Sequence, residues 1–139
     1  MPIVYLTRRA YFNAAHKLYN PIWSKEENEA RFGKCANEYW HGHNYHLFVT
    51  VKGTPNPETG FFINATELKA IVQRVIIDRV DHKNLNMEVP FLQGMMPSTE
   101  NFAITIWNEL MPHLKAAGCA LHCIKLRETE NLFVEYYGE

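Results

Sequence analysis

The strongest chemical signal in this sequence is a pair of histidines, His41 and His43, separated by one glycine. Successive side chains of a β-strand alternate between its two faces, so histidines at positions i and i+2 of a strand lie on the same face. Two imidazoles on one face can bind a single Zn²⁺ at about 2.0–2.1 Å, provided that a third ligand comes from elsewhere in the fold. The alternative is two unrelated histidines at the start of a strand.

Three other histidines are candidates for the third ligand: His16, His46 and His82. His46 lies an odd number of residues from His43, so a strand would point it to the opposite face. His16 ends a predicted strand, and a neighbouring strand could receive it beside the pair. Spacing alone does not choose among the three. Three histidines without a fourth protein ligand would leave one zinc position open for substrate or water, as in catalytic sites.

Cys35 and the adjacent pair Asp81 and His82 are further candidates. Cys35 lies six residues before His41, so it is a zinc ligand, a thiol base or nucleophile near a metal, or a small buried hydrophobic residue. The Asp81 carboxylate could orient the His82 imidazole, or the two residues could form a solvated turn at a helix end. The remaining cysteines and two further histidines are predicted to be structural: Cys119, Cys123, His113 and His122.

Length and composition place these candidates in a single globular domain, residues 1–139. Hydrophobic residues make up 47% of the chain and charged residues 21%, which excludes a disordered or collagen-like chain. The formal net charge of -1 disfavours a general nucleic-acid binder. Three cysteines are few and odd in number for a secreted disulfide framework, and no segment approaches the ~20 apolar residues of a membrane helix. We also find no apolar leader, and we expect a cytoplasmic protein without nucleic-acid or membrane partners.

The periodicity of the hydrophobic residues predicts an α+β order of elements. Stretches rich in β-branched and aromatic residues predict strands over residues 3–15, 44–52, 122–128 and 132–137. Residues 60–63 are predicted to extend again and to form a hairpin with the second strand. Apolar spacing and capping residues predict a short helix over residues 24–31, a helix capped by Asn64, and a helix capped by Ser98 or Thr99. This order predicts an antiparallel sheet with helices on one face.

Six short motifs, spread in order over most of the chain, resemble those of the 6-pyruvoyl-tetrahydropterin synthase family. Each motif alone is weakly specific, whereas six in the right order are highly specific. The motifs are Phe12–His16, Gly33–Cys35 followed by His41–Tyr45, Gly60–Lys69, Asp81–Asn86, Pro97–Asn101 and Arg127–Thr129.

The resemblance implies a zinc-dependent lyase that converts 7,8-dihydroneopterin triphosphate to 6-pyruvoyl-tetrahydropterin with elimination of triphosphate. A carboxylate suits the pterin ring, because it can accept hydrogen bonds from both the 2-amino group and a ring N–H. A thiolate near the metal can move a proton. The implied site comprises zinc ligands His16, His41 and His43, the catalytic relay Cys35, Asp81 and His82, the pterin anchor Glu128, and the pocket-lining residues Ser98, Thr99 and Glu100.

The resemblance also implies a fold and an assembly. The family has the tunnelling fold, a four-stranded antiparallel sheet with two helices on one face. Three subunits close a β-barrel, and two trimers stack into a hexamer. Active sites of such proteins lie between subunits, so we expect Glu128 and Cys35 of one pocket to come from different chains.

Alternative functions remain open from the sequence. The family also contains enzymes that make 6-carboxytetrahydropterin for queuosine, and enzymes that make 6-hydroxymethyl-dihydropterin for folate. In the folate branch a glutamate replaces the cysteine, and Glu38 stands three residues before His41 here, so Glu38 is a second candidate base. The gap of five residues between Cys35 and His41 is similar to the pyruvoyl branch. A different class is a non-catalytic zinc-binding or pterin-binding protein.

Overall fold

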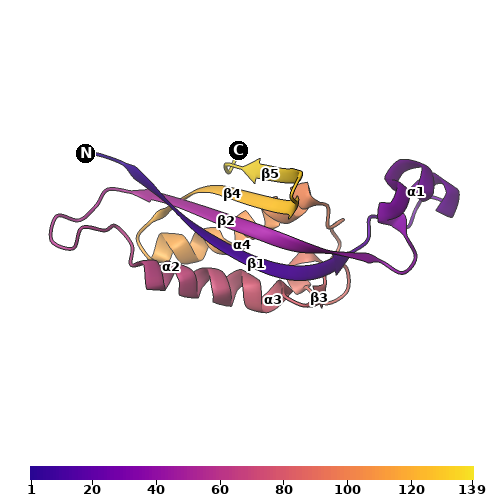
Figure 1. The fold of residues 1–139 in the computed structure, drawn as a ribbon, viewed down its shortest axis with the longest axis horizontal. Coiled ribbons are helices and arrows are strands. Elements are labelled where there is room, and N and C mark those ends of the chain that lie inside the picture. Colours follow the sequence, from indigo (N-terminus) through magenta and orange to yellow (C-terminus); the bar gives the residue numbers. More distant parts are fainter.

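A twisted sheet in the strand order β3-β1-β2-β4-β5 forms the centre of the molecule (Figure 1). The computed structural model describes all of residues 1–139. Neighbouring strands run antiparallel, except that β3 runs parallel to β1. The strands are β1 (Val4–His16), β2 (His41–Gly53), β3 (Lys83–Asn84), β4 (Ala120–Thr129) and β5 (Leu132–Tyr136).

The predicted α+β class and the four antiparallel strands are confirmed, and the short strand β3 is an addition. It forms because the backbone after the helical segment of residues 65–80 hydrogen-bonds to the end of β1: the His82 amide donates to the Asn13 carbonyl and the Leu85 amide to the Ala15 carbonyl. The predicted strand at residues 60–63 is wrong. There the backbone folds into a tight loop, in which Asn56 accepts from the Gly60 amide at 2.7 Å, so these groups cannot pair with a strand.

The helices begin where their capping residues predict. Side-chain oxygens of Ser24, Asn64 and Ser98 accept hydrogen bonds from amides in the first turns of their helices. A π-helical turn joins α2 to α3, so residues 65–80 form one helical segment. The helices are α1 (Lys25–Phe32), the 3₁₀ turn η1 (Gly33–Ala36), α2 (Ala65–Val72), the π turn η2 (Gln73–Ile77), α3 (Asp78–Val80), the 3₁₀ turn η3 (Pro90–Leu92) and α4 (Thr99–Ala116).

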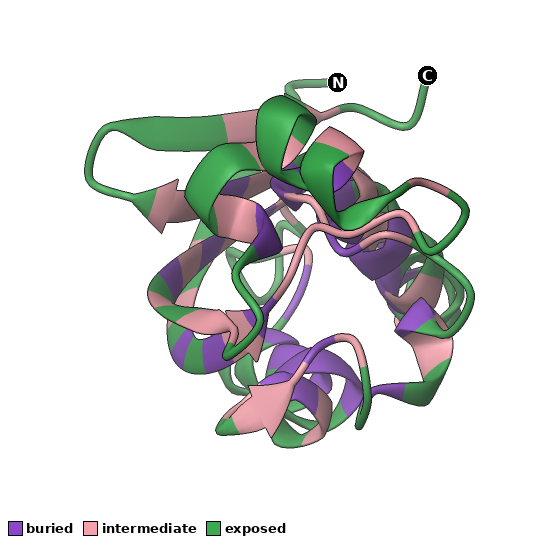
Figure 2. Cartoon of the chain, turned by 90° about the vertical axis from the view of Figure 1, so that its right-hand side faces the viewer, coloured by how far each residue is buried: buried purple, intermediate pink, exposed green.

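The hydrophobic core lies between one face of the sheet and the helices α2 and α4. The strands alternate between buried and exposed residues (Figure 2), and this alternation marks a sheet covered on one face only. Phe12 and Tyr45 stack at 5.0 Å between ring centres, and Phe102 of α4 packs edge-on against both. On the opposite face of the sheet, Tyr11 is 71% exposed. None of the helices combines the length and the apolar character that crossing a bilayer requires.

A buried asparagine holds the segment between β1 and β2 in place. Asn28 of α1 is 0% exposed. Its amide group donates to the carbonyls of Asn20 and Ser24 at 3.0 and 2.9 Å, and its oxygen accepts from the Asn20 amide at 2.7 Å. The segment that carries α1 projects from the main body of the molecule (Figure 1), and Asn28 is the only buried residue of α1. Because these bonds join α1 to the preceding loop, the Asn28 side chain holds the shape of this segment.

We expect Asn28→Ala to lower the unfolding free energy by about 1–3 kcal/mol, because it leaves the partly buried Asn20 amide without its partner and removes two further hydrogen bonds. Urea denaturation measures the global effect, and hydrogen exchange measures the local one, which we expect to concentrate in residues 18–36. Glu26→Ala, on the exposed side of the same helix, is the matched control. Wild-type exchange rates throughout this segment in Asn28→Ala would contradict the assigned role.

Candidate active site and metal centre

The register between β1 and β2 brings three histidines together. His16 is the direct partner of His41 across the two strands, and Ala14 is the partner of His43. Directly paired residues of an antiparallel sheet point to the same face, so all three imidazoles lie on the helix-covered face. Their ring centres are 4.6–5.0 Å apart.

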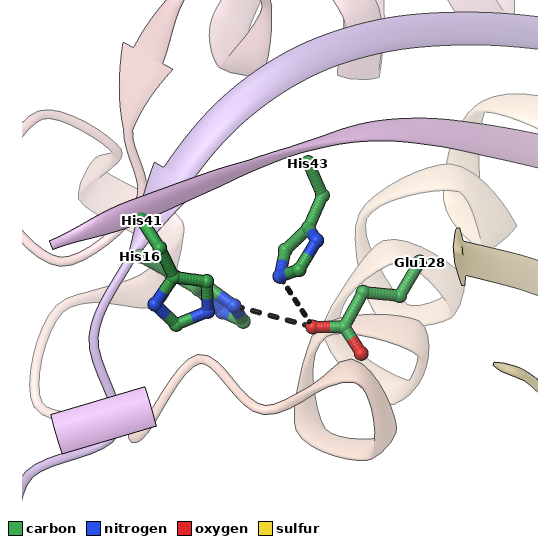
Figure 3. A group of neighbouring side chains, drawn as sticks. All are labelled: His16, His41, His43 and Glu128. Atoms are coloured by element: carbon green, nitrogen blue, oxygen red, sulfur yellow. Dashed lines mark ion pairs between the residues drawn. The ribbon is translucent and has the colours of Figure 1, made fainter. Parts of the chain in front are cut away.

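A carboxylate from a third strand completes this group. Glu128 has the strand parity of the buried Ile124 and Leu126, so it points to the helix-covered face, and it lies where the pairing of β4 with β5 shifts register. Its Oε1 atom lies 2.9 Å from His43 Nε2 and 3.2 Å from His16 Nε2. Potential ligand atoms of the four residues all lie within 4.8 Å of one another. Figure 3 shows the imidazoles and the carboxylate pointing toward a common centre, and we call this group the histidine cluster (His16, His41, His43 and Glu128).

The free nitrogen atoms of the histidine cluster fit a metal ion. His16 Nδ1 lies 2.8 Å from the Pro97 carbonyl. A carbonyl only accepts, so Nδ1 carries a proton and Nε2 is the nitrogen left to face Glu128 and to ligate a cation. His16 Nε2, His41 Nδ1 and His43 Nε2 are all buried, and although Glu128 Oε1 lies close to two of them, none of the three makes a well-formed hydrogen bond. Buried polar atoms are rarely left unpartnered, and a cation among three such nitrogens would satisfy them all.

The charges in the cluster also suit a divalent cation. Burial lowers the pKa of His41 and of His43, so both imidazoles are neutral near neutral pH. Contact with His16 lowers the pKa of the Glu128 carboxyl, despite the opposing effect of its burial, and His43 lowers it further. The cluster therefore offers neutral nitrogens and one carboxylate, which are the protonation states that ligate Zn²⁺ and related metals.

Cys35 lies beside the histidine cluster within the same chain. It belongs to the turn η1, and its carbonyl accepts a 2.8 Å hydrogen bond from the Leu18 amide, just after the end of β1. Burial raises the pKa of the Cys35 thiol, and the negative charge of Glu128 raises it further. The charge of Glu128 thus acts on Cys35 within one chain, and the expectation that one pocket takes the two residues from different chains stays a prediction about the assembly. Without a cation in the cluster, Cys35 is a thiol at neutral pH.

The pair Asp81 and His82 lies on the opposite face of the sheet. Asp81 Oδ1 accepts from the Asn13 amide at 3.0 Å and lies 3.0 Å from His82 Nδ1. The His82 side chain is 80% exposed and has a positive φ of 60°, a strained conformation that often marks functional positions. Both residues line a hollow of about 460 Å³ with Tyr11 and His46. His82 also lines a second hollow with His43, but neither residue of the pair belongs to the histidine cluster or acts on the Cys35 thiol within one chain.

The predicted pocket segment before α4 reaches the cluster in part. Thr99 is 4% exposed, and its hydroxyl contributes to the lowered pKa of Glu128. The Ser98 hydroxyl instead caps α4 by accepting from the Asn101 amide at 3.2 Å, and Glu100 is exposed in the first turn. Sequence reasoning missed the role of the Pro97 carbonyl, because a backbone acceptor leaves no signal in residue type.

Glu38 lies outside the histidine cluster. It is exposed and lines a separate hollow with Lys17 and Lys34. His46, which the strand parity excluded as a ligand, points to the other face beside Tyr11. The four residues predicted to be structural also lie outside the histidine cluster: Cys119, Cys123, His113 and His122.

Comparisons with known proteins agree on one family. The sequence model described as 6-pyruvoyl tetrahydropterin synthase matches residues 5–139. The chain is 48% identical over 136 residues to the 6-pyruvoyl tetrahydrobiopterin synthase of Dictyostelium discoideum, covering 98% of this chain and 97% of that protein. It is 42% identical over 134 residues to the Homo sapiens protein of the same name, covering 96% and 91%. The solved structure of Caenorhabditis elegans 6-pyruvoyl tetrahydropterin synthase matches with a TM-score of 0.92 and 34% identity, covering 100% of this chain and 98% of that one.

We expect the histidine cluster to bind one divalent metal ion per chain, and we expect His43→Ala to weaken binding by about 100-fold or more, because it removes a ligand and leaves too few nitrogens. Titration of metal-free protein with Co²⁺ reports binding through the absorbance of the bound ion. His46→Ala is the matched control, since it removes an imidazole from the same strand on the other face. Equal Co²⁺ affinity in the two variants would refute the site.

We expect Glu128→Gln to lower the pKa of Cys35 in the metal-free protein, because it removes the negative charge that opposes the thiolate. A lower pKa places the rise in thiolate at lower pH, so alkylation by iodoacetamide should accelerate at lower pH than in the wild type. Peptide mass spectrometry separates Cys35 from the two buried cysteines. Glu130→Gln, in the exposed turn between β4 and β5, is the control, and superimposable profiles for all three proteins would exclude the coupling.

Proposed function

Because the chain belongs to the 6-pyruvoyl tetrahydropterin synthase family, we propose that it is a lyase converting 7,8-dihydroneopterin triphosphate to 6-pyruvoyl-tetrahydropterin and triphosphate. The observation that carries the proposal is the histidine cluster with a half-buried thiol beside it. The reaction rearranges hydrogens within the substrate as triphosphate leaves, so it needs no external oxidant or reductant.

We assign the metal as Zn²⁺, with His16, His41 and His43 as its ligands. Three neutral imidazoles with one further position fit the usual catalytic zinc site. When bound, Zn²⁺ supplies a Lewis acid that polarises the side-chain hydroxyls of the substrate and acidifies the carbons that carry them. The Pro97 carbonyl holds His16 in the tautomer that such a ligand requires.

We assign Cys35 as the base that accepts a proton from a side-chain carbon of the substrate. The half-buried position of Cys35 beside Glu128 supports this role. Removal of that proton sends its electrons into a carbon–carbon double bond, and the carbon–oxygen bond to triphosphate breaks. Because its pKa is raised, Cys35 is mostly protonated in the chain without a metal ion. Positive charge in the cluster would offset the effect of Glu128 and lower the pKa of the thiol.

We assign Glu128 as the residue that anchors the pterin. Its carboxyl has a lowered pKa and is therefore ionised, as an acceptor for the 2-amino group and a ring N–H must be. The buried Thr99 lies against the same carboxylate and would line the pocket with Ser98 and Glu100. The close approach of Glu128 to two imidazoles also makes it a candidate fourth metal ligand when no pterin is bound.

We propose that the working enzyme is a homo-oligomer, a trimer closing a barrel and pairing to a hexamer. The sheet has two free edges, because β1 is paired on its outer side only near its end and β5 has one partner. Hydrophobic residues stay exposed near both edges, including Tyr5 at 57% and Phe133 at 46%. A second subunit would also supply Asp81 and His82 to Cys35, since neither acts on the Cys35 thiol within one chain.

Two observations favour the pyruvoyl product over the alternatives. Cys35 lies beside the histidine cluster, whereas Glu38 lines another hollow, so the glutamate-dependent folate reaction has less support. The queuosine reaction would use the same metal and cysteine, and product analysis separates it. A purely structural zinc site would not explain a thiol coupled to the cluster. The absence of disulfides among the free cysteines supports a reducing, cytoplasmic location.

We expect wild-type enzyme supplied with 7,8-dihydroneopterin triphosphate to form 6-pyruvoyl-tetrahydropterin, and we expect Cys35→Ala to slow its formation by about 100-fold or more, as befits loss of a general base. Chromatography identifies the product and distinguishes it from 6-carboxytetrahydropterin and 6-hydroxymethyl-dihydropterin. Glu38→Ala is the paired variant and should retain most of the pyruvoyl activity. Full activity in Cys35→Ala with an inactive Glu38→Ala would reverse the assignment of the base and favour the folate reaction.

A further inference from the structure

A hollow of about 690 Å³ lies where the end of β1 meets the segment that leads into β2. Three lysines from separate parts of the chain line it, and we call it the lysine hollow (Lys17, Lys25 and Lys34). Tyr19, Tyr39 and the backbone at Gly33 form other parts of its wall. The carboxylates of Glu29 and Glu38 also line it, so the wall carries three positive and two negative side chains.

Two of the lysines are not neutralised by acidic partners. Neither Lys17 nor Lys34 forms an ion pair, and the pair of Lys25 with Glu29 is loose, at 4.0 Å between two exposed side chains. Aromatic rings support Lys17 instead: its Nζ lies 4.6 Å from the ring centre of Tyr19 and 5.4 Å from that of Trp40. The lysine hollow therefore presents positive charge that is free to meet an anion.

The lysine hollow adjoins the candidate active site through the chain itself. Lys17 directly follows His16, and Lys34 directly precedes Cys35. The 2.8 Å bond from the Leu18 amide to the Cys35 carbonyl holds these two segments together. Trp40, immediately before the His41 ligand position, has a φ of 70°, a strained backbone that a non-glycine residue adopts rarely. The same short segments thus contribute residues to both the histidine cluster and the lysine hollow.

We infer that the lysine hollow binds the triphosphate group of the substrate, an inference that rests on the proposed function. With the pterin side chain held by its hydroxyls at the histidine cluster, the triphosphate begins on the next carbon and must extend away from the cluster. Lysines suit this task because they bind phosphate as flexible point charges rather than by rigid bidentate pairing. The carboxylates of Glu29 and Glu38 in the same wall limit the affinity, which helps triphosphate to leave after elimination.

Inorganic triphosphate is the probe for this site, with binding measured by calorimetry on the metal-loaded protein. We expect the double variant Lys17→Met with Lys34→Met to weaken triphosphate binding by about tenfold or more. Loss of even one charge-assisted contact with phosphate is expected to weaken binding by about tenfold. Lys69→Met, an exposed lysine of α2 without an ion pair, is the control and should bind as the wild type does. We expect Glu38→Gln to bind triphosphate more tightly, because it removes an opposing charge.

Each protein is checked for metal content, because triphosphate chelates metal ions, and for its unfolding midpoint. If the double variant does not fold, Lys34→Met alone serves the test, since Lys34 is exposed. In steady-state assays we expect KM for the triphosphate substrate to rise about tenfold with a smaller change in kcat, while binding of dihydroneopterin without phosphates stays unchanged.

The lysine hollow and the proposed function fail in distinguishable ways. Wild-type protein that does not bind triphosphate, or a double variant that binds it unchanged, overturns the inference. Normal turnover with an unchanged KM in the double variant overturns it too and leaves the proposed function standing. Lysine-dependent binding of triphosphate without conversion of the pterin substrate rejects the proposed function and keeps the anion site.

Discussion

The antiparallel pairing of β1 with β2 is the constraint on which the site depends, because it sets His16 directly opposite His41. A shift of one residue in this register would move His16 away from its partner and place Phe12 and Tyr45 out of line in the core. The stacked rings of Phe12 and Tyr45, buried against α4, therefore hold the same register that gathers the imidazoles. Core packing and site geometry are two results of one strand pairing.

Electrostatic balance explains why this group of residues is suited to a cation. Burial keeps His41 and His43 neutral, while contact with His16 keeps the Glu128 carboxyl ionised. The buried nitrogens without well-formed hydrogen bonds and the partly buried carboxylate each have an energetic cost in the chain alone. The negative charge of Glu128 also raises the pKa of Cys35. A cation in the cluster would therefore lower the energetic cost of the buried groups and, by offsetting this charge, favour the Cys35 thiolate. In the proposed mechanism, metal binding and activation of the base would thereby be coupled through Glu128.

The uncovered face of the sheet determines which residues one chain leaves exposed to a second subunit. Helices bury one face, whereas the other face and both edges keep aromatic and charged residues exposed. Asp81 and His82 lie on that open side and Cys35 on the covered side. A single chain thus holds the proposed metal ligands, base and pterin anchor, and lacks only the proposed partner of the base. This division of residues gives a chemical reason for the proposed assembly.

The sequence by itself determined the α+β class, the helix caps and the shared face of His41 and His43, because capping and strand alternation depend on neighbouring residues only. The resemblance of its motifs identified the family and named the residues of the site. Only the tertiary structure decided that Glu128 reaches the histidines, that the Pro97 carbonyl holds His16 Nδ1, and that Asp81 bonds to the edge of β1. Strand β3 and the loop at residues 60–63 were also beyond the sequence. These features arise from strand register and from backbone contacts between distant segments, which local residue patterns do not encode.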